Sequence, residues 1–163
     1  MPSVRRYHER DWDAFVELDV EVGLQTLRHA PEEEREIFRK RWPTRLKERW
    51  SWGPEGPVAE ASALFVVEDD DGAYGGHLWL TESEDVRTGV ARLWVNSVAV
   101  VQRCRSRGFG RLLMERAEEE ARARGITSIG LRVDADNVVA RKLYEEMGYQ
   151  TVRLRMIKQL RRG

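Results

Sequence analysis

Apolar residues recur along this chain at two spacings, one typical of helices and one typical of strands. The first half begins with a short expected strand, Ser3–Tyr7, and a helix that starts after Asp11, whose side chain suits an N-cap. A second helix carries Glu32–Glu34 in its first turn, and Pro43 is expected to interrupt or kink it. The stretch Trp50–Pro57 is rich in Gly and Pro and predicts a loop.

The rest of the chain alternates strands with helices, and glycines stand where the helices are expected to end. Such an alternation predicts one mixed α/β domain. The expected elements are the hairpin strands Ala63–Glu68 and His77–Thr81, the strand Ala91–Val101, the helix Gly110–Arg124, the buried strand Ser128–Val133, the helix Asn137–Met147 and a last strand, Val152–Gln159.

Length and composition fit one globular domain, since the chain has 163 residues, of which 41% are hydrophobic and 34% charged. It contains no apolar run of about 18 residues and no apolar core of a signal peptide near its start. We therefore expect a soluble, cytoplasmic protein with no membrane partner. A single cysteine, Cys104, and three histidines without paired spacing exclude a disulfide framework and favour no metal site.

Charge is divided unevenly along the chain. Residues 1–101 carry 13 basic and 20 acidic side chains, whereas residues 102–163 carry 15 basic and 8 acidic ones. The asymmetry arises either by chance in a charge-rich chain or because the second half holds a polyanion and the first meets a cation. Lysine is scarce and no dense basic run is interleaved with aromatic residues, so no nucleic-acid partner is expected.

The segment Val98–Leu113, VAVVQRCRSRGFGRLL, places a turn rich in Gly and Arg between an expected strand and an expected helix. Backbone N–H groups at a helix N-terminus, together with the helix dipole, can bind a phosphate. The turn is neither a Walker loop nor a dinucleotide fingerprint, because the required lysine and third glycine are absent. Taken alone, it also fits a plain tight turn with solvated arginines.

A second motif, Val133–Tyr149, has the sequence VDADNVVARKLYEEMGY. Together with the turn before it, this motif resembles the GNAT superfamily of N-acetyltransferases, in which V-x-x-x-N-x-x-A-x-x-L-Y-E-x-x-G-[FY] follows an [RQ]-x-x-G-x-[GA] turn. Every fixed position of both motifs is matched, in the right order. The resemblance covers Ala91–Tyr149, which is more than a third of the chain.

The resemblance implies a single domain over residues 1–163, with an α/β (α+β) fold. In that fold helices flank a central, mixed but mostly antiparallel sheet, and a splayed strand pair holds acetyl-CoA. Residues 1–90 would form the acceptor side, 91–149 the acetyl-CoA-binding core and 150–163 a C-terminal strand. The implied enzyme moves an acetyl group from acetyl-CoA directly to a primary amine of a small molecule or peptide. The alternatives are a non-catalytic acyl-CoA-binding module, or a transferase that uses another acyl-CoA or a protein N-terminus.

The resemblance also assigns roles to individual residues. The pantetheine arm would pair like an added strand with the backbone of Val98–Val100, and Asn137 would contact the cofactor besides capping its helix. Tyr144 would be the general acid, because a phenol of pKa about 10 can protonate a thiolate of pKa about 8.5. The cofactor-binding residues are Val98, Ala99, Val100, Arg105, Ser106, Arg107, Gly108, Phe109, Gly110, Arg111, Asn137 and Tyr144.

The chain departs from the family pattern at two positions. Ser106 replaces a glycine that many members have, although its backbone N–H remains available to a phosphate. Trp94 stands where some members place a general-base glutamate. The base is therefore Asn96 or Ser97 acting through water, a carboxylate of the acidic half, or the solvent. Weaker candidates are Glu82, Glu84, Asp85 and His77, and we take Cys104 as structural.

The acceptor site is expected to come from Val22–Pro57 and from the ends of the later strands. Five tryptophans line either this site or the core: Trp42, Trp50, Trp52, Trp79 and Trp94. The acidic first half favours a cationic amine, such as a polyamine, an aminoglycoside-like compound or a peptide N-terminus. The sequence does not set the oligomeric state, and a homodimer is common among members.

Overall fold

The structure, a computed structural model, describes residues 1–52, 62–158 and 160. The chain divides into two compact units, Met1–Arg132 and Val133–Gly163, and each is described by itself. The first contains β1 (Ser3–Arg6), η1 (Glu9–Asp11), α1 (Trp12–Thr26), α2 (Glu32–Trp52), β2 (Ser62–Glu68), β3 (Tyr74–Glu84), β4 (Ala91–Val100), η2 (Gln102–Cys104), α3 (Phe109–Ala123) and β5 (Ile129–Gly130). The second contains α4 (Val138–Glu146). No described helix combines the length and the apolarity that a membrane crossing needs.

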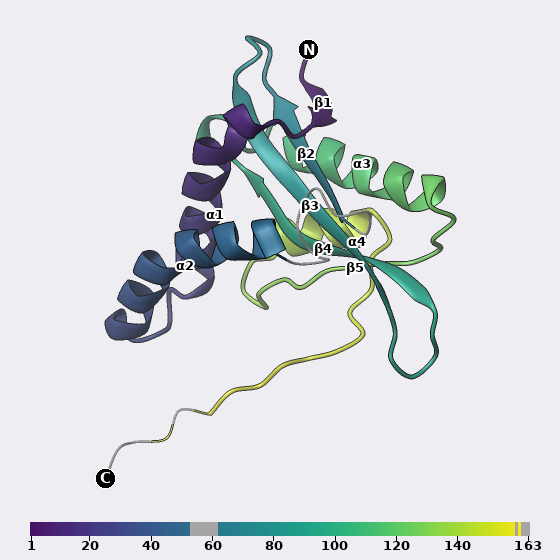
Figure 1. The fold of residues 1–163 in the computed structure, drawn as a ribbon. Coiled ribbons are helices and arrows are strands. Elements are labelled where there is room, and N and C mark those ends of the chain that lie inside the picture. Colours follow the sequence, from purple (N-terminus) through teal and green to yellow (C-terminus); the bar gives the residue numbers. More distant parts are fainter. Residues whose placement is uncertain (53–61, 159, 161–163) are drawn as a thin grey trace. The chain divides into compact units, whose positions relative to one another are not determined.

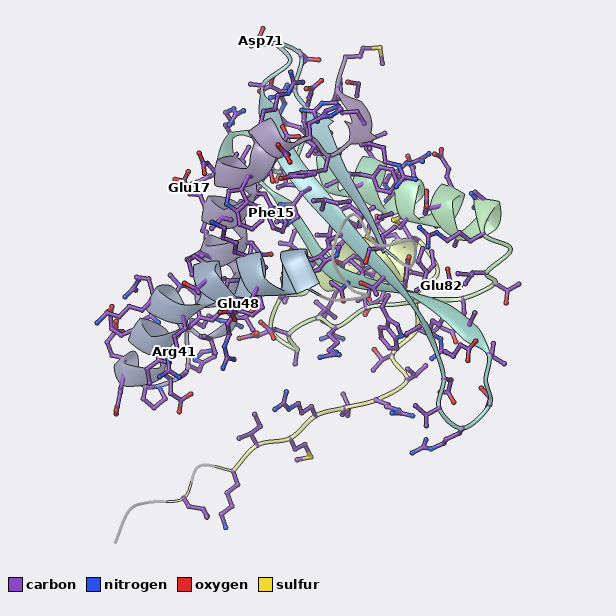
Figure 2. The ribbon with its side chains drawn as sticks, in the orientation of Figure 1. Phe15, Glu17, Arg41, Glu48, Asp71 and Glu82 are labelled. Carbon is purple, nitrogen blue, oxygen red and sulfur yellow. The ribbon has the colours of Figure 1, made fainter. Side chains whose placement is uncertain are left out.

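The sheet has the strand order β1-β2-β3-β4-β5, in which the first four strands are antiparallel and β5 is parallel to β4 (Figure 1). Helices α1 and α2 cover one face, where Phe15 packs with Leu64 and Trp79 (Figure 2). Phe65 points to the opposite face, toward α3, where the Arg116 guanidinium carbon lies 4.5 Å from the centroid of the Phe65 ring. This mixed, mostly antiparallel sheet with flanking helices confirms the expected fold class.

Helix α3 has the stripe that its sequence predicts. Leu113, Ala117 and Ala121 are buried on one side, and Gly125, in the left-handed conformation with φ 67°, follows the helix end. The same side also buries a carboxylate, Glu120.

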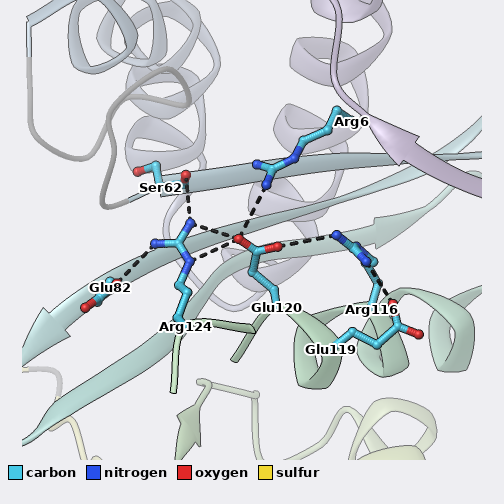
Figure 3. Close-up of polar contacts among 7 residues, drawn as sticks. All are labelled: Arg6, Ser62, Glu82, Arg116, Glu119, Glu120 and Arg124. Atoms are coloured by element: carbon cyan, nitrogen blue, oxygen red, sulfur yellow. Dashed lines mark hydrogen bonds and ion pairs between the residues drawn. The ribbon is translucent and has the colours of Figure 1, made fainter. Parts of the chain in front are cut away.

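Glu120 is surrounded by three arginines, which tie α3 to the neighbouring elements (Figure 3). Its Oε1 accepts from Arg124 at 3.0 Å and from Arg6 of β1 at 3.5 Å, and its Oε2 accepts from Arg116 at 3.4 Å. Arg124 also bonds Glu82 of β3 at 3.1 Å. A buried carboxylate requires such partners, so we assign this network to the fold.

The expected break in the second helix is wrong. Helix α2 continues through Pro43 to Trp52, so the first residues of the expected loop are helical. Residues 53–57 of that loop lie outside the described residues. Proline removes one N–H···O bond of the helix, and the burial of side chains on both sides of it offsets that loss: Trp42 packs against the core and Leu46 is fully buried.

Two expected strands are also corrected. The expected buried strand Ser128–Val133 is reduced to the two half-buried residues of β5. The expected strand Val152–Gln159 does not form over its described residues, 152–158, which have no regular structure and whose apolar side chains are exposed. Alternation of apolar and polar residues supplies strand propensity only, and a strand forms where a neighbouring strand completes its hydrogen bonds.

Candidate functional site

The turn between β4 and α3 has an unusual backbone. Ser106 and Gly108 both adopt positive φ, at 59° and 84°, and Gly108 is the N-cap of α3. Among the described residues, Ser106 is the only non-glycine with positive φ. Left-handed residues in a tight turn can bring neighbouring N–H groups toward one side, which suits an anion. The first-turn N–H groups of a helix, here including those of Phe109 and Gly110, add to it.

Three arginines of the turn are paired with carboxylates from the first half of the chain. Arg103 donates to Asp69 at 3.0 Å, Arg105 to Glu21 at 2.7 Å and Arg107 to Asp70 at 3.0 Å. All three arginines are about half exposed. Exposed ion pairs of this kind contribute little and exchange readily. The turn can therefore present positive side chains to an anion.

Strands β4 and β5 part after two paired residues. Leu93 pairs with Ile129 and Trp94 with Gly130, and no described strand pairs with β4 on that side beyond Trp94. A Cβ on Gly130 would lie 2.6 Å from the Trp94 ring, so this ring fills the space at the point of divergence. The residues Val98–Val100 that follow thus offer an open backbone edge toward that side. This is the expected splayed strand pair.

On its other side β4 pairs with β3 and contains a bulge. Trp79 of β3 pairs with Ser97 and Leu80 pairs with Val95, which leaves Asn96 as the extra residue. Asn96 is exposed, and its side-chain amide donates to the Thr81 hydroxyl. The bulge aims the following residue, Ser97, into the space between the sheet and α1.

Ser97 belongs to a buried polar cluster that links both N-terminal helices to the sheet. Its hydroxyl lies 2.6 Å from Asp19 Oδ1 and 2.8 Å from His77 Nε2. The Trp42 indole donates to Asp19 Oδ2 at 2.7 Å, and the Tyr74 hydroxyl lies 2.7 Å from His77 Nδ1. His77 is fully buried and Asp19 nearly so.

The electrostatics of the cluster favour an ionised Asp19. Burial by itself raises the pKa of this carboxyl, but the nearby His77 and the hydrogen bonds from Ser97 and Trp42 outweigh it, so the pKa is lowered. Burial, with the nearby charges of Asp11 and Asp19, raises the pKa of Tyr74, which therefore remains a phenol. The cluster thus combines a fixed negative charge with neutral hydroxyl donors.

The structure sorts the expected base candidates. Ser97 contacts a carboxylate of the acidic half, namely Asp19, which the sequence alone did not single out. Glu82 bonds Arg124, and Asp85 accepts hydrogen bonds from backbone N–H groups of its own turn, which lower its pKa. His77 is part of the core, and Cys104 is buried and unpaired, in keeping with a structural role.

The tryptophans divide between two environments. Trp79 is 2% exposed and belongs to the core, while Trp42 is half buried and packs against that core. Trp94 is half buried against Gly130. Trp50 and Trp52 lie in the last turn of α2, and their side chains are outside the described part of the structure.

In the second unit, Asn137 and Tyr144 both lie on α4 or its cap. Asn137 is the N-cap, and its Oδ1 accepts from the N–H of Ala140 at 3.2 Å, so the capping role is confirmed. Tyr144 is 9% exposed, with the Tyr149 ring centroid 5.8 Å from its own. Burial raises the pKa of the Tyr144 phenol. Gly148, with φ 89°, follows the helix end as expected.

Comparison with known proteins identifies relatives over most of the chain. The sequence model of the acetyltransferase (GNAT) family matches residues 27–149. Mycothiol acetyltransferase of Beutenbergia cavernae is 38% identical over 94 residues, which are 57% of this chain and 30% of that protein. The uncharacterized N-acetyltransferase YdgE of Bacillus subtilis is 30% identical over 107 residues, 66% of this chain and 67% of YdgE. The chain thus spans about 30% of the length of the first of these relatives.

Solved structures agree with these sequence matches. A putative acetyl transferase from Pyrococcus furiosus superimposes with a TM-score of 0.75 at 27% identity, covering 98% of this chain and 100% of that one.

Proposed function

Because this chain belongs to the acetyltransferase (GNAT) family of acetyl-CoA-dependent acyltransferases, we propose that it transfers the acetyl group of acetyl-CoA directly to a primary amine. The acceptor is a small molecule or a peptide. One observation carries the proposal: the open edge of β4 over Val98–Val100 continues within a few residues into the left-handed turn at the start of α3.

The residues present fit the two polar parts of acetyl-CoA. The backbone N–H groups of the turn after Arg105 and of the first turn of α3 suit its pyrophosphate, and the open β4 edge suits the amides of its pantetheine arm. A backbone N–H near Val98 would then lie beside the thioester carbonyl, where negative charge develops in the transition state. The Val100 carbonyl already accepts a hydrogen bond from Arg105 Nε at 3.0 Å, so a pantetheine amide would share or replace that bond.

The chemistry requires a proton for the leaving group. The amine nitrogen attacks the thioester carbon, the C–N bond forms, and the C–S bond breaks with its electron pair on sulfur. We assign the protonation of this thiolate to Tyr144, whose raised pKa keeps the phenol protonated throughout the neutral range. Asn137, the cap of the same helix, is assigned to cofactor contact on the strength of the family motif alone.

Substitution of the tyrosine tests this role. We expect Tyr144→Phe to lower kcat by roughly 100- to 10,000-fold, the usual effect of a lost general acid, with little change in the Kd for acetyl-CoA. Tyr149→Phe is the matched control, since it removes the hydroxyl of the neighbouring ring. Full turnover by Tyr144→Phe would rule out the acid role.

The function itself is tested by titrating acetyl-CoA calorimetrically and then measuring thiol release with a panel of amines: spermidine, phenethylamine, an aminoglycoside and a short peptide with a free N-terminus. Binding followed by amine-dependent thiol release supports the proposal. If acetyl-CoA binds but no amine of the panel causes thiol release, either from acetyl-CoA or from other acyl-CoAs assayed in the same way, the protein is an acyl-CoA-binding module. If acetyl-CoA does not bind, the proposal is refuted.

A further inference from the structure

The buried cluster around Ser97 has one hydrogen-bonding site that its own residues leave unused. Proton positions follow from the charge of Asp19. An ionised carboxylate only accepts, so the 2.6 Å contact with Asp19 must carry the Ser97 proton. Ser97 has no second proton, so His77 Nε2 must donate to its oxygen across 2.8 Å.

On the other side of the ring, His77 Nδ1 lies 2.7 Å from the Tyr74 hydroxyl. Hydrogen bonds therefore run from His77 Nε2 through the Ser97 hydroxyl to Asp19. A hydroxyl oxygen has two lone pairs, and in the part of the chain that the structure describes only His77 donates to that of Ser97.

This order excludes a hydrolase-like triad. In such a triad the histidine accepts the serine proton and thereby activates the oxygen as a nucleophile. Here His77 donates a hydrogen bond to the Ser97 oxygen, and the Ser97 hydroxyl donates one to the Asp19 carboxylate. The Ser97 oxygen is consequently a hydrogen-bond acceptor, and the negative charge of Asp19 adjoins it.

The lowered pKa of Asp19 also argues against a base role for this carboxylate. A carboxyl that is ionised well below neutral pH takes a proton from an ammonium group only at a large energetic disadvantage. Asp19 therefore provides a permanent negative charge, and the proton that the amine loses passes to the solvent.

We propose that Ser97 binds the acceptor amine through its remaining lone pair, and that Asp19 is a positioning residue that fixes the Ser97 hydroxyl and supplies negative charge. The inference rests on the proposed function, which places the thioester beside Val98, the next residue of β4. The nitrogen donates an N–H to Ser97 Oγ while its lone pair attacks the thioester carbon. Positive charge develops on nitrogen as the C–N bond forms, and the Ser97–Asp19 pair stabilises that charge.

The proposal names the acceptor class as a primary amine that is cationic before it reacts. Ser97 is half buried, whereas its partners Asp19 and His77 are buried, so Ser97 is the more accessible end of this hydrogen-bonded series. A hollow of about 360 Å³ reaches the cluster at Tyr74, and its charged lining residues are Glu17 and Glu21 of α1 together with Arg103.

Steady-state kinetics at saturating acetyl-CoA test the proposal. With phenethylamine as acceptor we expect Ser97→Ala to lower kcat/KM for the amine about 10- to 100-fold, the usual effect of a lost bond to a charged group. The Kd for acetyl-CoA should not change. Ser97→Thr, which keeps a hydroxyl, should restore most of the activity. Ser62→Ala is the matched control, because it removes a buried serine hydroxyl of β2 that has no hydrogen-bond partner among the described residues.

A charge comparison separates positioning from plain structural support. Asp19→Asn keeps the shape of the side chain and removes its charge, so it should impair the cationic phenethylamine more than aniline, which is uncharged at neutral pH. Equal impairment of both amines, or an unchanged kcat/KM in Ser97→Ala, would overturn the proposal. If Ser97→Ala does not fold, the Asp19→Asn comparison decides. A wild-type protein that acetylates no amine would instead refute the proposed function.

Discussion

Ser106 holds a backbone conformation that most residues with a side chain avoid. Its φ of 59° lies in the left-handed region, at the centre of the turn assigned to the pyrophosphate. Gly108, with φ 84°, has open space where a Cβ would stand, so conformation rather than crowding favours glycine there. The sequence predicted the turn and the replacement of a glycine by Ser106, but it did not predict the left-handed backbone of this serine.

Replacing this serine should relieve the strain. We expect Ser106→Gly to raise the free energy of unfolding by about 0.5–1 kcal/mol, since the relief exceeds the added entropy of the unfolded chain. Chemical denaturation measures the change, and acetyl-CoA should still bind. Ser106→Ala, which keeps the Cβ, serves as the control and should give no gain. A Ser106→Gly protein no more stable than wild type would show that the turn is unstrained.

Asp19 is the residue that sequence reasoning missed. It follows the buried Phe15 by four positions, which places it on the same side of α1, facing the sheet. A carboxylate on the apolar stripe of a helix was the available signal. Its partners come from α2, β3 and β4, however, and residues that distant in sequence cannot be paired from periodicity.

At the scale of elements, the apolar pattern of α3 correctly predicted its buried stripe but not the buried polar residue beside it. The stripe of Leu113, Ala117 and Ala121 was predicted, whereas the burial of Glu120 beside it was not. Glu120 can be buried between α3 and the sheet because three arginines pair with its carboxylate oxygens (Figure 3). They are Arg6 of β1, Arg116 of α3 and Arg124, the C-cap of α3. Such a network requires the packed arrangement of the elements.

Neighbouring glutamates of α3 allow a matched test. We expect Glu120→Gln to lower the free energy of unfolding by about 1–3 kcal/mol, because it leaves buried donors without their charged partner. Glu119→Gln should change it by less than about 0.5 kcal/mol, since Glu119 is exposed and, within the part of the chain that the structure describes, pairs with Arg116 alone, at i,i+3. Thermal or chemical denaturation measures both. Equal effects would mean that the network adds nothing to the fold.

At the scale of the molecule, the uneven charge of the chain has a structural explanation. Carboxylates of the acidic half meet arginines of the basic half at the turn after β4, where Glu21, Asp69 and Asp70 hold Arg105, Arg103 and Arg107. Part of the asymmetry is therefore neutralised within the protein. An anion bound at the turn would compete with these exposed pairs.

Acid should destabilise the whole molecule through its low-pKa carboxyls. The pKa of Asp19 is lower in the folded protein than in the unfolded chain, where it is about 3.9. Its stabilising contribution is therefore complete above that pH and is lost as the pH falls toward the folded-state value. We expect the difference in unfolding free energy between wild type and Asp19→Asn to shrink below about pH 4. Denaturation at pH 7 and pH 3 measures this, and a constant difference would mean that the folded-state pKa is not lowered.

The sequence by itself determined the order of elements, the fold class and the family, because spacing of apolar residues and two local motifs are recorded in short stretches of chain. It located the Gly–Arg turn, the cap Asn137 and the helix ends at Gly125 and Gly148. Only the tertiary structure decided where β4 and β5 part, since that depends on the Trp94 ring against Gly130. It also decided that Asp19 is the carboxylate that accepts the hydrogen bond of Ser97, because contacts between distant residues form only when the helices pack on the sheet.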